Sequence, residues 1–110
     1  MDKIETYSQI IKAYLQEYQQ YSQDDDIETL LIFDETHGHY QLLAMGWQNK
    51  RRVHNTIIHL QIKGDKVWLQ QNSTDILVAE ELVERGIPQD HIVLGFQPEH
   101  RRPYTDYAVA

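Results

Sequence analysis

Hydrophobic residues between positions 3 and 22 recur in alternating steps of three and four, which is the spacing of one face of an α-helix. This stripe consists of Ile4, Tyr7, Ile11, Tyr14, Tyr18 and Tyr21, and Ile10 and Leu15 widen it. Asp2 and Glu5 have the spacing of a capping box, which marks a helix start. The three aspartates at 24–26 then favour a turn, because adjacent short acidic side chains disfavour helix. The pattern therefore predicts a helix over residues 3 to about 22.

Between residues 28 and 71 the pattern changes to short β-prone runs with turn residues between them, which is typical of a strand meander. We expect strands at 28–35, at 39–47, after the turn at 48–50 as far as residue 63, and at 67–70. The third strand alternates most clearly, with one face made of His54, Thr56, Ile58, Leu60 and Ile62 and the other of Asn55, His59, Gln61 and Lys63. Gly64 and Asp65 predict a two-residue hairpin turn of type I′ or II′.

A second helix is predicted over residues 75–85, with cap oxygens at 73–75 and a face of Ile76, Ala79, Leu82 and Val83 that covers the sheet. Gly86 and Ile87 fit a Schellman end. The apolar run at 92–96 could add a fifth short strand before an irregular tail. The expected fold is α+β, in the order α-β-β-β-β-α. It is an antiparallel four-stranded meander with both helices packed on one face, in a single domain of residues 1–110.

Composition narrows the classes of function. A chain of 110 residues and 13.1 kDa suits one domain. The absence of cysteine excludes disulfides, thiolate nucleophiles and cysteine-based metal sites, and it favours a cytoplasmic location. The longest apolar run, at 30–33, is far shorter than the roughly 18 residues of a membrane span, so we expect no membrane association.

No catalytic or cofactor motif is present in the sequence, which contains no P-loop, dinucleotide fingerprint or nucleophile elbow. Asp34 and Glu35 are adjacent and would point to opposite faces of a strand, which is poor geometry for a catalytic pair. His37 and His39 have a spacing that metals use, but a polar hairpin turn explains them more simply. We therefore expect no enzymatic activity, no cofactor and no metal site.

Charge is distributed unevenly along the chain, whose net charge is −7. Residues 1–35 carry nine acids and two bases, residues 36–64 carry four bases and no acid, and residues 65–110 carry eight acids and four bases. The middle segment contains Lys50, Arg51 and Arg52, with His54 close behind. This basic loop could contact a phosphate backbone or the acidic surface of another protein, or it could be only a solvated turn.

Aromatic residues give two candidate partner surfaces. Tyr7, Tyr14, Tyr18 and Tyr21 share the face of the first helix, where they either cap the sheet with their hydroxyls at the rim or form the contact of a homodimer. Phe96, Tyr104 and Tyr107 lie in the tail, and disordered tails seldom hold aromatics at that density. We expect the tail to pack on its own or a neighbouring subunit, with Arg101 and Arg102 near the acids of a helix.

Several motifs together carry a family resemblance. They are Trp47 with Arg51, Arg52 and His54; Gly-Ile-Pro at 86–88; Asp-His-Ile-Val-Leu-Gly-Phe at 90–96; and Arg-Pro-Tyr-Thr-Asp-Tyr-Ala-Val-Ala at 102–110. The chain resembles the XisI family over nearly its whole length. It departs from the family where Gln97-Pro98 stands in place of two prolines that often follow Gly-Phe.

The resemblance implies a function in cyanobacteria. Members of the XisI family are known as fdxN-element excision controlling factors, which act with a companion called XisH and a site-specific recombinase in programmed DNA excision during heterocyst differentiation. The resemblance supplies no catalytic residue. We therefore expect a non-enzymatic accessory factor that binds a XisH-like, nuclease-type protein, with a homodimer as a further option. The alternative is an excision factor that contacts DNA directly through the basic loop at 50–54.

Overall fold

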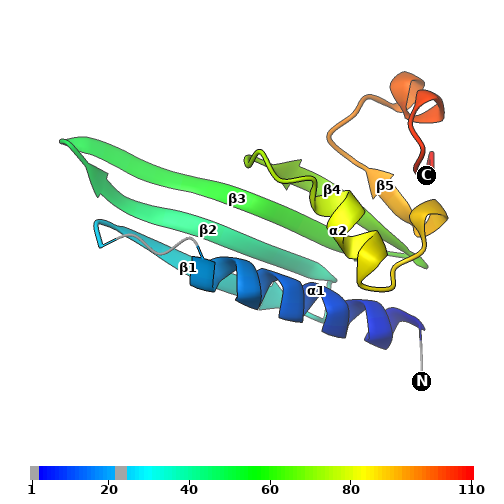
Figure 1. Cartoon of the computed structure of the whole chain (residues 1–110), viewed down its shortest axis with the longest axis horizontal. Coiled ribbons are helices and arrows are strands. Elements are labelled where there is room, and N and C mark those ends of the chain that lie inside the picture. Colours follow the sequence, from blue (N-terminus) through cyan, green and yellow to red (C-terminus); the bar gives the residue numbers. More distant parts are fainter. Residues whose placement is uncertain (1–2, 22–24) are drawn as a thin grey trace.

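The computed structural model describes residues 3–21 and 25–110, so Asp2 of the predicted capping box and Asp24 of the acidic run lie outside the described residues. The elements follow in the order α1 (Lys3–Tyr21), β1 (Ile27–Asp34), β2 (His39–Gln48), β3 (Arg51–Lys63), β4 (Lys66–Asn72), α2 (Val78–Glu84), the 3-10 helix η1 (Gln89–His91), β5 (Ile92–Leu94) and the 3-10 helix η2 (Glu99–Tyr104). Figure 1 shows both α-helices on the same face of one sheet. The predicted α+β fold is confirmed.

The five strands lie in the order β1-β2-β3-β4-β5. The first four form the predicted antiparallel meander. β5 confirms the fifth short strand and pairs with β4 in parallel. A parallel neighbour needs a crossover connection, which here contains α2. The Gly64-Asp65 hairpin also forms as expected, and positive φ at Gly64 alone fits a type II′ turn.

A β-bulge in β3 changes the predicted faces of that strand. Leu42 of β2 pairs with Ile58, whereas Leu43 pairs with Thr56, so Ile57 is an extra residue in β3. An extra residue reverses the alternation beyond it. His54 therefore pairs with Met45 on the outer face of the sheet. The expectation that His54 and Thr56 share a face with Ile58 is wrong.

The core lies between the sheet and the two helices. Ile11 and Leu15 of α1 and Leu82 of α2 are fully buried on its helical side. The strands contribute Tyr40, Leu42, Ile58, Leu60, Val67, Leu69 and Ile92 from the other side. In the described part of the chain, no helix is long and apolar enough to cross a membrane.

The second helix begins later than predicted. It starts at Val78, because the polar residues before it form a turn of their own. Asn72 Oδ1 accepts hydrogen bonds from the backbone N–H and the hydroxyl of Thr74, and its Nδ2 donates to the carbonyl of Ile76 at 2.7 Å. Such local bonds compete with helix. The Schellman end is confirmed, since the N–H of Ile87 donates to the carbonyl of Leu82 at 3.1 Å.

The tail packs on its own chain. The N–H of Ala108 donates to the carbonyl of Ile92 at 2.8 Å, and Ala108 bridges Val93 in parallel. Tyr107 packs against the core. The expected position of Arg102 near the acids of a helix is wrong, because its guanidinium lies over the Trp68 ring, 5.0 Å from the centroid.

Candidate functional site

The tyrosine face of α1 divides into a buried part and an exposed part. Tyr7 and Tyr14 are buried in the core, Tyr18 packs partly against it, and Tyr21 is 88% exposed. The hydroxyl of Tyr7 is 2.6 Å from Nδ1 of His91. The hydroxyl of Tyr14 donates to Oε1 of Glu81 at 2.8 Å. Tyr7 and Tyr14 therefore cover the sheet with their hydroxyls at its rim, which was one of the two expectations for this face. Among the four tyrosines of α1, only Tyr18 and Tyr21 offer ring surface to a partner.

Tyr14 also joins α1 to α2 electrostatically. Burial raises the pKa of its hydroxyl, and the hydrogen bond to Glu81 raises it further, so the group stays neutral and acts as a donor. Arg85 lies over the Tyr14 ring at 4.9 Å from the centroid and forms an ion pair with Glu17. These contacts fix the position of α2 beside α1.

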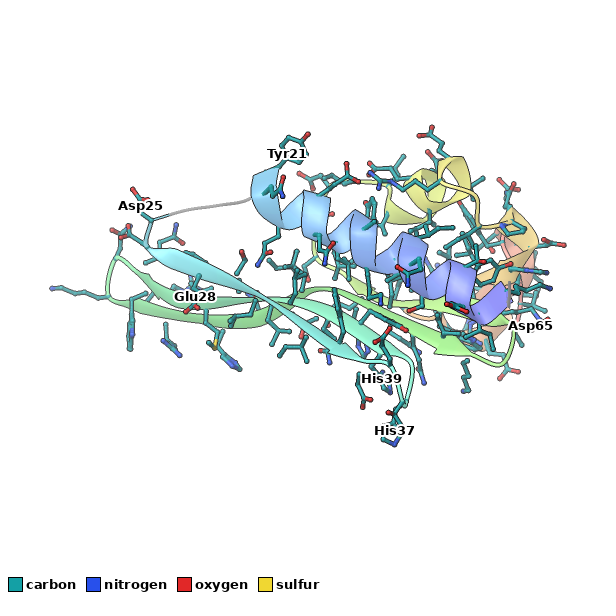
Figure 2. The ribbon with its side chains drawn as sticks, turned by 90° about the horizontal axis from the view of Figure 1, so that it is seen from below. Tyr21, Asp25, Glu28, His37, His39 and Asp65 are labelled. Carbon is teal, nitrogen blue, oxygen red and sulfur yellow. The ribbon has the colours of Figure 1, made fainter. Side chains whose placement is uncertain are left out.

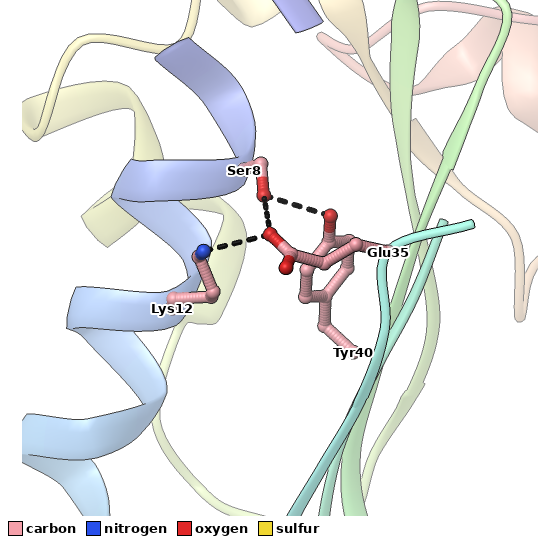
Figure 3. A network of polar contacts seen from close by, with 4 residues as sticks. All are labelled: Ser8, Lys12, Glu35 and Tyr40. Carbon is pink, nitrogen blue, oxygen red and sulfur yellow. Dashed lines mark hydrogen bonds and ion pairs between the residues drawn. The ribbon is translucent and has the colours of Figure 1, made fainter. Parts of the chain in front are cut away.

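A network of polar side chains fixes the other end of the helix–sheet contact, as Figure 3 shows. The hydroxyl of Tyr40 is 2.8 Å from Oγ of Ser8, which donates in turn to Oε1 of Glu35 at 3.3 Å. Nζ of Lys12 donates to the same carboxylate oxygen at 2.7 Å, and this contact lowers the pKa of Glu35. Because Ser8 has one proton to give, Tyr40 is the donor in their mutual bond.

Hollows lie on both sides of α2. One, of about 190 Å³, lies between the helices and includes Tyr14, Glu17, Tyr18, Tyr21, Ile76, Glu81 and Arg85 in its lining. The other, of about 160 Å³, lies between α2 and the tail and is lined by Leu69, Asn72, Leu77, Val78, Ala79, Glu80, Leu94, Phe96 and Tyr107. We call the solvent-facing part of this region the α2 surface, which consists of the exposed residues Tyr21, Leu77, Glu80, Glu84 and Phe96 and the partly buried Tyr18.

The α2 surface combines exposed apolar side chains with negative charge. Leu77 is 63% exposed and Phe96 is half-exposed. Glu80 and Glu84 are exposed on the same helix, while the nearby cation Arg85 is already paired with Glu17. Exposed Tyr104 lies apart from this surface, in a hollow with Gln97, His100, Arg101 and Thr105.

The β2–β3 hairpin brings the predicted basic residues together. Lys50, Arg51, Arg52 and His54 are all exposed at or near its tip. Asn49 and Lys50 both have positive φ, as in a type I′ turn. The guanidinium of Arg52 lies 5.5 Å from the ring centroid of exposed Trp47. The hairpin extends well beyond the end of α1 (Figure 1).

The histidines do not converge on one point. His37 contacts Asp34 at 2.8 Å and lowers the pKa of that carboxyl, whereas Nδ1 of His39 is 3.0 Å from Nε2 of His59. His54 pairs with Met45 farther along the sheet. Within residues 3–21 and 25–110, no group of three or more potential ligands is placed to hold a metal ion.

Sequence reasoning missed two features of these surfaces. Leu77 lies in a segment that was predicted to be helical, so its exposure before the true helix start was not visible. The outer face of the sheet also carries a row of large apolar side chains. Its signal was the unbroken run at 30–33, which places apolar residues on both faces of β1.

Comparisons with known proteins agree with the resemblance. The chain matches the family described as XisI protein over residues 1–109. A crystal structure of a XisI-like protein from Anabaena variabilis shares 43% identity with a TM-score of 0.89, covering 99% of this chain and 100% of that one. The fdxN element excision controlling factor XisI from the same organism shares 35% identity with a TM-score of 0.87 and the same coverage. No curated protein matches. The chain belongs to the XisI family.

Proposed function

We propose that this protein is a non-enzymatic controlling factor of programmed DNA excision, and that it acts by binding a XisH-like, nuclease-type protein through the α2 surface. The name of the related factor from Anabaena variabilis supports the process. The observation that carries the binding mode is the exposure of Leu77, Phe96 and Tyr21 around α2, beside two hollows that could receive partner side chains. Aromatic and apolar anchors next to pockets are typical of interface hot spots.

The charge of the α2 surface defines the partner's chemistry. Glu80 and Glu84 are exposed, and the two outer segments of the chain carry all of its acids. A complementary patch on the partner would therefore be basic at its rim and apolar at its centre. Rim charges mainly speed association and make it sensitive to salt.

Co-purification with a XisH-like protein, called the companion below, tests the proposal. We expect a stable complex with the wild-type chain and a loss of at least about tenfold in affinity for Leu77→Asp, because the charge enters an apolar contact. The matched control is Lys50→Glu on the hairpin, which should bind the companion like the wild type. Failure to form a complex, or equal loss in both variants, contradicts the proposal.

A second candidate function is direct contact with DNA through the hairpin. The observation in its favour is that Lys50, Arg51 and Arg52 are exposed at the tip, with Trp47 beside them. Basic side chains interleaved with an aromatic ring suit a nucleic-acid backbone. Fluorescence anisotropy with a labelled duplex at about 50 mM salt tests it, since phosphate contacts are strong there. Binding that Lys50→Glu abolishes and Leu77→Asp preserves would favour this candidate, and no binding would exclude it.

A further inference from the structure

The outer face of the sheet carries an apolar row on β1 and β2. Strand register places Leu30 beside Leu43 and Glu28 beside Met45, on the side opposite buried Leu42. The row consists of Leu30, Ile32, Leu43, Met45 and Trp47. Ile32 is 47% exposed and Trp47 is 60% exposed. In Figure 2 both helices lie above the sheet, and the labelled Glu28 and His39 lie on the side below it.

The tail covers the other half of this outer face. Trp68 of β4 has Arg102 over its ring at 5.0 Å and Lys63 at 4.9 Å. Its neighbour in β5, Val93, is fully buried and is bridged by Ala108. The tail therefore closes the β4–β5 half, while the apolar row on β1 and β2 keeps the exposure described above.

We propose that this outer face packs against the same face of a second copy of the chain, to form a two-fold symmetric homodimer. Sheets pack face to face through apolar side chains at about 10 Å separation. The proposal goes beyond the function proposed above, because the α2 surface lies on the opposite side of the sheet. The two surfaces can therefore be tested separately.

The charged side chains on either side of the apolar row favour a second copy of the chain as the partner that packs on this face. β1 carries acids on this face, Glu28 and Asp34, whereas β3 carries Arg52, His54 and His59. β1 and β3 lie on either side of β2. A two-fold axis that runs parallel to β2, between the two sheets, therefore places β1 of each copy over β3 of the other. Glu28 of each copy then faces the β3 segment of the other copy that carries Arg52 and His54, and the two-fold axis repeats this contact twice. An axis across the strands would place acids on acids, which is unfavourable.

The strand register makes this arrangement specific. Glu28 pairs with Met45, and Met45 pairs with His54, so all three lie at one level of the sheet. Rotation about an axis parallel to β2 preserves this level. Glu28 of each copy therefore lies opposite His54 of the other, and the two Met45 side chains face each other at the axis, between the two Glu28–His54 pairs. An isologous contact of this kind closes on itself.

Sedimentation velocity of the full chain, from low to high micromolar concentration near neutral pH, tests the proposal. We expect a species of twice the 13.1 kDa chain mass. Met45→Lys should weaken the dimer at least about tenfold, because it puts a charge at the centre of the contact. The lysine lies beside Glu28 within its own chain, so the fold should tolerate it. Leu77→Lys on the opposite side is the matched control and should stay dimeric.

Charge reversal tests the direction of the axis. Glu28→Arg and His54→Glu should each weaken the dimer several-fold, and the double variant should recover most of the affinity, because the pair is restored in reverse. A second variant, Ile32→Lys, repeats the test of the apolar row at an exposed edge position. A wild-type chain that stays monomeric throughout, equal dissociation of Leu77→Lys, or no recovery in the double variant would overturn the proposal. Loss of companion binding by Met45→Lys in a monomeric chain would instead assign this face to the companion.

Discussion

At the scale of single residues, the position of α1 depends on one small hydroxyl. Ser8 is the buried polar residue of the described core, and it receives a hydrogen bond from Tyr40 while it donates to Glu35. Tyr40 is itself almost completely buried, so water cannot replace Ser8 as its partner. Burying a polar group without a partner costs more than a formed hydrogen bond contributes.

Replacement of Ser8 measures this contribution. We expect Ser8→Ala to lower the free energy of unfolding by about 1–3 kcal/mol, since the buried Tyr40 hydroxyl loses its acceptor. Urea denaturation gives the value. Lys12→Met is the control, because it removes a solvent-facing contact to the same carboxylate and should cost less. A larger loss in Lys12→Met than in Ser8→Ala would contradict this assignment.

His59 makes the stability of the fold depend on pH. Burial lowers its pKa, and neighbouring His39 lowers it further. The unfolded chain therefore binds a proton more readily than the folded chain, starting near the ordinary histidine value of about 6.5. The stabilising contribution of neutral His59 is therefore fully present above about pH 6.5. It is lost as the pH falls from there through the lower pKa that His59 has in the folded chain.

The expected outcome is a melting temperature that falls between about pH 7.5 and about pH 5, and falls less steeply in His59→Gln. Thermal unfolding followed by circular dichroism at both pH values checks it. His37→Gln is a suitable control, because that imidazole is exposed and contacts Asp34 at 2.8 Å instead. Equal pH slopes in the wild type and in His59→Gln would show that other groups dominate.

At the scale of elements, the tail belongs to the sheet. Removal of residues 95–110 takes away the bond from Ala108 to Ile92, the packing of Tyr107 and the contact of Arg102 with Trp68. We expect a loss of roughly 1–3 kcal/mol or more, because part of the core becomes exposed. Differential scanning calorimetry measures it. Removal of only Val109 and Ala110 should leave the melting temperature unchanged, and an unaffected melting temperature in the longer deletion would refute the structural role of the tail.

The order of these elements could be predicted from the sequence, because its periodicities are strong. The spacing from Ile4 to Tyr21 gives α1, and the Gly64-Asp65 turn fixes one hairpin. The bulge at Ile57 could not be predicted, because an extra β-branched residue leaves an apolar run looking regular. The sequence pattern also predicts a start of α2 that is too early, at residue 75 instead of Val78. Asn72 and Thr74 are good cap residues by type, but they bond to each other and to Ile76.

The candidate site was less predictable than the fold. Periodicity places Tyr7 and Tyr21 on one helix face, yet of these two rings only that of Tyr21 is exposed. Exposure depends on which neighbours reach a ring, such as His91 beside Tyr7. A linear pattern does not contain that information. The basic cluster on the hairpin was easier to predict from the sequence, because Lys50, Arg51 and Arg52 are consecutive.

At the scale of the whole molecule, the two proposed contacts lie on opposite sides of the sheet. The α2 surface surrounds Leu77, and the outer face is centred on Leu43. Both can therefore be occupied at once, and we expect an assembly of two copies of this chain with two copies of the companion. Light scattering after size-exclusion chromatography gives the mass. Met45→Lys should reduce this assembly to one copy of each protein. Leu77→Asp should prevent binding of the companion, so that only the homodimer of this chain remains. A wild-type mass that corresponds to one copy of each would contradict the combined arrangement.

The bridge between Ala108 and Val93 has a consequence for aggregation. It places the chain's own C-terminal segment along β5, which partly occupies that border of the sheet. At the opposite border, Gln19 donates from α1 to the carbonyl of Thr29 at 3.0 Å. Endless stacking of strands into fibres requires two open borders on every molecule, one to accept a neighbour and one to offer. A tail that occupies part of one border hinders a second strand from adding there, so it disfavours growth of strand-added assemblies beyond a pair.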